Sequence, residues 1–132
     1  MSKVHATLTS PDGCSVTVDG NADVSYDRKN KYWIVVKFTG TVTLGGGSGC
    51  PKGTMTFKHK GSNDKPGSDK ELTAKVHGKN LRDVSKITWR GGDSRVNELL
   101  NQSGLNEDLC KQLRSATEAA EVPARVAKGK ST

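Results

Sequence analysis

The chain has 132 residues, enough for one modest domain with a single core. Its hydrophobic fraction is 32%, aromatic residues make up 5%, and 15 glycines indicate many turns. Residues 1–10 lack the apolar stretch of a signal peptide, and no segment reaches the length of a membrane span, so we expect neither. A chain this polar either packs loosely as a monomer or gains buried apolar surface by pairing with a copy of itself. We favour the pairing.

The net charge of +7 is unevenly distributed along the chain. Residues 1–90 hold 15 Lys and Arg against 8 Asp and Glu, whereas residues 91–132 hold 6 of each sign. The excess therefore lies in the body of the chain and favours a folded basic surface over a basic arm. The alternative is a charged surface that only keeps the protein in solution.

The first ninety residues alternate as strands do. Residues 3–19 predict a hairpin around the turn sequence SPDG, and residues 23–30 a weaker third strand. Residues 31–44 carry the strongest β signal, and the apolar run Trp33 to Val36 predicts a central strand covered on both faces. GGGSGCPKG is expected to be a flexible loop.

In residues 52–61, Met55, Phe57 and His59 alternate with Thr and Lys, which predicts a strand with one core face and one polar face. Residues 71–78 favour a strand, although Glu71, Leu72 and Ala74 are good helix formers and leave a helix open. Residues 84–92 complete the β-rich part.

After residue 92 the apolar period becomes helical. Asp93 or Ser94 is expected to cap a short helix that ends at Gly104, and Asn106 to cap a longer one that Pro123 stops. The longer helix has an apolar stripe of Leu109, Leu113, Ala116 and Ala120.

These elements predict an α+β fold: an N-terminal hairpin and antiparallel sheet, about seven strands in all, followed by two C-terminal helices packed on one face. Residues 1–122 form one domain, β-rich over 1–90 and helical over 94–122, and residues 123–132 are expected to be a flexible basic tail.

The three cysteines, Cys14, Cys50 and Cys110, lack metal-ligand or CxxC spacing. Free thiols in a reducing compartment are the simpler interpretation, and a Cys14–Cys50 bridge stays open. His5, His59 and His77 also lack ligand spacing, GGGSG lacks the Lys-Ser/Thr of a phosphate loop, and no triad can be assembled. We therefore expect no metal, no cofactor and no enzymatic activity.

Alternation places Lys beside Thr on the polar side of several strands. Lysine neutralises phosphate charge and threonine hydroxyls donate to phosphate oxygens, so such a face suits a nucleic-acid backbone. Of Tyr26, Tyr32, Trp33 and Trp89, three lie in strands expected in the core, which predicts little base stacking. The candidate RNA-binding residues are Lys37, Lys58, Lys60, Lys75, Lys86 and Arg90. Alternatively, Thr and Lys only solubilise the open side of the sheet.

This order of hairpin, sheet and two helices, with DRKNKYWIVVKF as a basic segment leading into an alternating strand, resembles the coat proteins of single-stranded RNA bacteriophages. The resemblance implies a dimer with helices packed across the partner subunit, assembly into an icosahedral shell, RNA on the inner sheet face, and a location in the virion or host cytoplasm. The competing hypothesis is a small protein-binding module, such as a phage-encoded inhibitor or adaptor, whose basic sheet meets an acidic partner.

Overall fold

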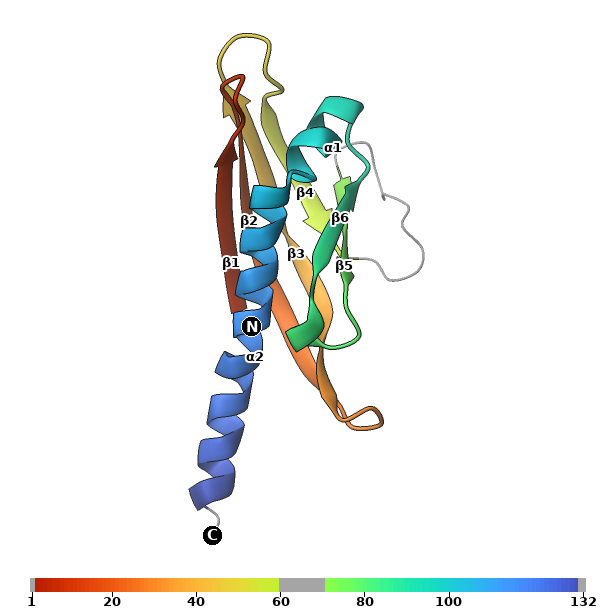
Figure 1. Ribbon diagram of the computed structural model, residues 1–132, viewed down its shortest axis with the longest axis vertical. Helices are drawn as coiled ribbons and strands as arrows, with labels where there is room; N and C mark the ends of the chain where they lie inside the picture. Colours follow the sequence, from red (N-terminus) through yellow and green to blue (C-terminus); the bar gives the residue numbers. More distant parts are fainter. Residues whose placement is uncertain (1, 60–70, 131–132) are drawn as a thin grey trace.

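The computed structural model describes residues 2–59 and 71–130, with side chains described up to Ala116. Six strands form one sheet in which sequence order is also spatial order (Figure 1). The strands are β1 (Ser2–Thr9), β2 (Cys14–Asp27), β3 (Tyr32–Gly46), β4 (Gly53–Lys58), β5 (Glu71–His77) and β6 (Lys86–Arg90).

All neighbouring strands are antiparallel except β4 and β5, which run parallel. The predicted α+β class is confirmed, with six strands where about seven were expected. The difference arises because residues 14–19 and 23–27 belong to one long β2, whose alternation continues through Gly20 to Ala22. Residues 71–77 form a strand, which decides against the helix that their composition left open.

A break in register divides the long β2–β3 ladder. Asp23 pairs with Lys37, but the next residue, Val24, pairs with Val35, so Val36 is the extra residue of a β-bulge. Val36 is 52% exposed. The expectation that residues 33–36 are covered on both faces is therefore wrong: beyond the bulge the two strands form a hairpin whose end lies away from the buried core, at the bottom of Figure 1.

Two helices follow the sheet, after a 3₁₀ turn η1 (Leu81–Asp83) between β5 and β6. Helix α1 (Ser94–Leu100) is capped by the Asp93 side chain, which accepts from the Val96 N–H as predicted. Helix α2 (Ser103–Lys130) begins before Gly104 and Asn106, so these residues are not the helix end and cap expected of them.

Pro123 lies inside α2 and does not end it. A proline removes one backbone donor from a helix but does not necessarily terminate it. Residues 123–130, expected as a flexible tail, are assigned to the same helix, which extends beyond the sheet in Figure 1.

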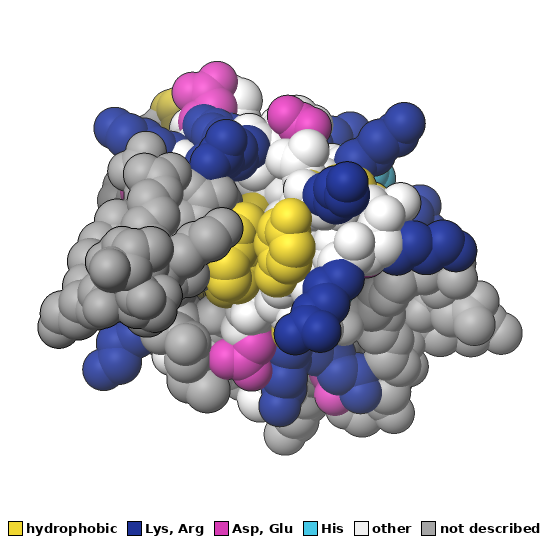
Figure 2. All heavy atoms as spheres, turned by 90° about the horizontal axis from the view of Figure 1, so that it is seen from below, with side chains coloured by type: hydrophobic (Ala, Val, Ile, Leu, Met, Phe, Trp, Pro, Cys, Tyr) yellow, Lys and Arg dark blue, Asp and Glu magenta, His cyan; other side chains and the backbone are white. Residues whose placement is uncertain are grey.

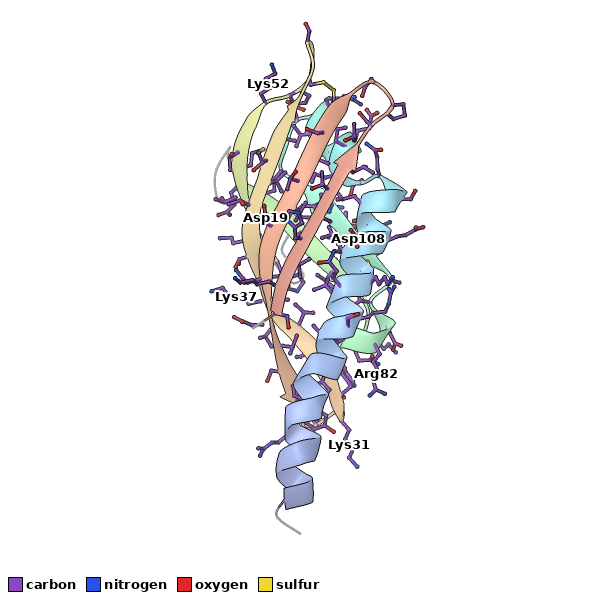
Figure 3. The ribbon with its side chains drawn as sticks, turned by 90° about the vertical axis from the view of Figure 1, so that its left-hand side faces the viewer. Asp19, Lys31, Lys37, Lys52, Arg82 and Asp108 are labelled. Atoms are coloured by element: carbon purple, nitrogen blue, oxygen red, sulfur yellow. A yellow bond between two sulfur atoms is a disulfide. The ribbon has the colours of Figure 1, made fainter. Side chains whose placement is uncertain are left out.

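Both helices cover the same face of the sheet (Figures 1 and 3). The stripe residues Leu109, Leu113 and Ala116 are buried as expected, while Ala120 is outside the described side chains. In the sheet, Phe57 packs edge-to-face between Phe38 and Trp89, with ring centroids 4.9 and 5.1 Å apart. This aromatic cluster forms the centre of the core.

The aromatic cluster can pack against the sheet only because β2 and β3 carry glycine at the point of contact. Gly20 and Gly40 pair across β2 and β3. A Cβ atom on Gly20 would lie 2.8 Å from Phe57 Cζ, and one on Gly40 would lie 2.6 Å from Gly20 Cα. Gly20 therefore lets the Phe57 ring rest directly on the sheet, and Gly40 leaves room for the β2 backbone beside it.

Side-chain amides from α2 and from the end of α1 bind both edge strands. Gln112 accepts from the His5 N–H (2.8 Å) and donates to the His5 carbonyl (2.7 Å) on β1. Asn101 does the same for Trp89 on β6, at 3.0 and 3.2 Å. Each side-chain amide makes the two backbone hydrogen bonds that a neighbouring strand would make. These backbone groups of the edge strands are therefore satisfied within the chain.

Cys14 and Cys50 form a disulfide with a Cα–Cα distance of 5.3 Å, which corrects the interpretation of all three cysteines as free thiols. The β2–β3 pairing places Cys14 opposite Gly46, and the glycine-rich turn returns Cys50 to it. Spacing alone could not reveal this, because the two cysteines are 36 residues apart. Cys110 is free and buried, and burial raises the pKa of its thiol.

Candidate nucleic-acid interface

Within residues 2–59 and 71–130, one face of the sheet is not covered by a helix, and we call it the open face (Figures 1 and 3). It carries the residues that alternate with the core set on each strand. Strand register places five of the six predicted RNA-binding residues on it: Lys37, Lys58, Lys75, Lys86 and Arg90. Lys60 lies outside the described residues.

One row of the open face crosses the whole sheet. It joins residues opposite one another on successive strands: Lys3, Asn21, Thr39, Lys58, Thr73 and Arg90. Thr73 is buried, and the other five are exposed or half-buried. Two further pairs, Lys75 with Thr88 and His77 with Lys86, lie beside this row on β5 and β6. Basic side chains and hydroxyl or amide side chains are therefore neighbours across the strands as well as along them.

The open face changes in character toward the disulfide. A second row consists only of threonines, one from each of four strands: Thr7, Thr17, Thr43 and Thr54. The Thr7 and Thr17 hydroxyls are 3.3 Å apart. The half near the disulfide is thus neutral and hydroxyl-rich, and the cations lie farther along the strands.

Up to the bulge, the described open-face residues include six basic side chains and three acidic ones, Asp19, Asp23 and Glu71. Glu71 Oε1 lies 3.2 Å from Lys58 Nζ, which neutralises part of that charge. Lys75 and Arg90 have interactions of their own. Lys3, Lys37 and Lys86 are exposed and make no ion pair within the described part of the chain, so they are the cations most available to a ligand.

The three histidines occupy separate places. His5 Nδ1 contacts Asp19 on the open face, and His77 Nε2 lies 2.8 Å from the Thr88 hydroxyl. His59 Nδ1 lies 3.1 Å from the Ala74 carbonyl oxygen, so this ring bridges the ends of β4 and β5. Among residues 2–59 and 71–116, no three His, Cys, Asp or Glu side chains gather as metal ligands would.

The turn between β1 and β2 is fixed to α1 by charge. Arg95 contacts the Asp12 carboxylate and donates to Glu98 at 3.0 Å. The Ser10 hydroxyl, as the main cause, and Arg95 lower the pKa of Asp12 below its ordinary value. These contacts hold the turn between β1 and β2 against α1.

Sequence reasoning missed the surface at the hairpin end. Tyr32 and Trp33 were expected in the core, but both are only half-buried, and Tyr26 is 45% exposed. All three line a cavity of about 370 Å³ together with Lys31, Asn80, Leu81 and Arg82. The signal that could have indicated it is the basic turn DRKNK directly flanked by these rings.

Viewed from this end, hydrophobic side chains form a patch bordered by Lys and Arg (Figure 2). The open face and the hairpin end are therefore two distinct basic surfaces. No helix within the described residues has the length and apolar character needed to span a bilayer.

Comparison of the chain with protein-family models, with curated proteins and with solved structures found no match.

Proposed function

We propose that the protein is a non-enzymatic structural protein that dimerises and binds the backbone of RNA through the open face, as a small viral coat protein would. The observation that carries the proposal is the row from Lys3 to Arg90, in which cations and hydroxyl or amide groups cross a sheet face free of helices. Lysines supply charge neutralisation, and threonines supply donors to phosphate oxygens.

Two further features support the coat interpretation. The helices cover one face only, so the other is free to line the inside of a shell (Figure 3). The C-terminal end of α2 extends beyond the sheet of its own chain, where a second copy could meet it (Figure 1). Pairing would add apolar contact to a chain whose hydrophobic fraction is 32%.

The first test is size-exclusion chromatography with light scattering, with absorbance read at about 260 and about 280 nm across the peak. We expect large particles that carry nucleic acid. A small dimer free of nucleic acid would contradict the coat proposal and favour the protein-binding module, whose basic sheet would meet an acidic partner.

The second test locates the residues that bind RNA. The triple variant Lys37→Gln, Lys75→Gln and Lys86→Gln should reduce the slope of log affinity against log salt by about one unit for each phosphate interaction that it removes. The control removes two exposed lysines away from the open face, Lys52 and Lys111, and the change in slope is compared per lysine removed. Equal slopes for the triple variant and the wild type would show that the open face only solubilises the sheet.

A further inference from the structure

Half of the aromatic side chains of the protein line one small cavity. Of six rings, Phe38, Phe57 and Trp89 form the buried cluster of the core. The other three, Tyr26, Tyr32 and Trp33, line the cavity at the hairpin end. A chain with so few aromatic residues would gain more stability by burying them, so their exposure calls for a reason other than stability.

The rings are held in place before any ligand arrives. Tyr26 and Trp33 pair in register across β2 and β3, and their ring centroids are 5.5 Å apart with the planes tilted by 60°. Trp33 also packs against the core cluster. The exposed Tyr26 ring therefore packs against the Trp33 ring, which is itself partly buried against the core.

The β2–β3 turn places cations beside these rings. The Asp27 carboxylate accepts from the Lys29 N–H at 3.0 Å, the Asn30 N–H at 3.2 Å and the Asn30 side-chain amide at 2.8 Å. Lys31 closes the turn with φ 60° and donates its N–H to the Asp27 carbonyl at 2.7 Å. The Asp27 carboxylate therefore accepts its hydrogen bonds from groups of the turn itself. The side chains of Arg28, Lys29 and Lys31 are exposed.

The opposite wall of the cavity is a second turn of the same kind. The Asn80 amide donates to the Asp83 carboxylate at 2.6 Å, and the Asp83 N–H donates back to Asn80 Oδ1 at 3.1 Å. Arg82 lines the cavity from this turn and has an interaction of its own. Lys79 is exposed beside it.

We propose that this cavity binds an unpaired nucleotide of single-stranded RNA, with the base stacked on Tyr26 and the adjoining phosphate against Lys31. A volume of about 370 Å³ lies within the range of small-ligand sites. Stacking on an aromatic ring requires a base free of its duplex, and every base offers a π-face, so the site selects single strands without reading a sequence.

This site goes beyond the RNA-backbone function proposed for the open face. It uses none of the same residues, and its rings lie beyond the bulge, at the end of the molecule opposite Lys52 in Figure 3. Up to the bulge, the described open-face residues from Lys3 to Arg90 are Lys, Arg, His, Thr, Asn and carboxylates, which offer hydroxyls and charge but no aromatic ring. Stacking is possible at the hairpin end and not there.

The test measures fluorescence anisotropy of a labelled hexaadenylate at fixed salt. Tyr26→Leu removes the ring and keeps an apolar side chain, and Tyr26→Phe keeps the ring. Val36→Ala is the matched apolar control, because Val36 is 52% exposed on β3 but does not line the cavity. Lys31→Gln is paired with Lys52→Gln, an exposed lysine at the other end of the molecule.

We expect Tyr26→Leu to weaken hexaadenylate binding by about five-fold or more, as removal of one stacking ring predicts, with Tyr26→Phe and Val36→Ala unchanged. Lys31→Gln should weaken binding more than Lys52→Gln does. Adenosine monophosphate should compete better than ribose 5-phosphate, which has the phosphate without the base.

Equal affinity for Tyr26→Leu and Val36→Ala would overturn the nucleotide site. So would loss of a dimer in Tyr26→Leu without a change in RNA affinity, because the cavity would then be covered by a second copy of the chain. The open-face triple variant separates the two proposals: it retains Tyr26, so its residual binding should still depend on that ring whether or not the open face binds RNA.

Discussion

The two ends of the β2–β3 ladder differ in nearly every property. At one end the Cys14–Cys50 disulfide and the glycine-rich turn close the ladder around Gly46. At the other end, beyond the bulge at Val36, the same two strands carry one exposed and two half-buried aromatic rings and a basic turn. Since the strands are continuous, the difference comes from what each end contacts.

The two ends therefore divide stability and binding along one pair of strands. The disulfide end holds the sheet together and carries the row of threonines, whereas the hairpin end has Tyr26 and Val36 exposed and presents groups that suit a ligand. The bulge marks the boundary, as bulges often do where a strand turns side chains toward a site. Mutations at the two ends should separate loss of stability from loss of binding.

Loss of the disulfide should have the largest effect. The bridge closes a segment of 36 residues, so the double variant Cys14→Ser and Cys50→Ser is expected to lose roughly 3 kcal/mol of unfolding free energy. Urea denaturation with and without reductant measures this. The reductant should shift the wild-type midpoint and leave the double variant unchanged; equal midpoints for wild type and variant would show that this end does not depend on its bridge.

Gly46→Ala should be next, at about 2 kcal/mol. Gly46 has φ 121°, and a Cβ there would lie 2.5 Å from the Gly13 carbonyl oxygen and 3.1 Å from Cys50 Sγ. The neighbouring Gly47→Ala is the control, since a Cβ there meets nothing within 4 Å. Thermal melts of both variants should differ; similar melting temperatures would mean that the turn adjusts freely.

A matched pair of valines on β3 tests the same contrast. Val42 is fully buried near the disulfide end, and Val36 is 52% exposed at the bulge. Val42→Ala should lose about 1.5–3 kcal/mol, whereas Val36→Ala should stay within about 0.5 kcal/mol of wild type. Both are read from chemical denaturation midpoints. A large loss at Val36 would show that the hairpin end is covered, for example by a second copy.

Sequence alternation predicted the covered and open faces well. It placed Lys58, Lys75 and Lys86 on one side, and strand register brings them onto one face. This succeeds because the period of a strand decides which side chains share a face, whatever the neighbouring strand is. The same period could not give the parallel pairing of β4 and β5, which depends on the path between them.

The hairpin end could not be predicted in this way. Apolar residues on both faces of residues 33–36 predicted burial, but burial depends on whether other elements reach that far along the strand. The bulge adds a residue and turns Val36 outward, which no local pattern indicates. The disulfide was missed for a related reason, since it joins residues that only the β2–β3 pairing brings together.

The smallest expected effect is an acid transition confined to the hairpin turn. Hydrogen bonds from Asn30, first its side chain and then its backbone, lower the pKa of Asp27 below its ordinary value of 3.8. A carboxyl whose pKa is lower in the folded state contributes stability above its unfolded pKa and loses it as the pH falls through the folded pKa. The turn should therefore loosen only below about pH 3.8.

Amide NMR shifts of Lys29 and Asn30, followed from about pH 6 to about pH 2, measure this transition. The control is Asp27→Asn, which keeps an acceptor oxygen but cannot titrate, so its shifts should stay flat through the same range. An inflection at or above the ordinary value of 3.8 would show that the Asp27 network does not hold the turn. In that case Lys31 would not be fixed beside Tyr26, and the preorganisation assigned to the hairpin end would be lost.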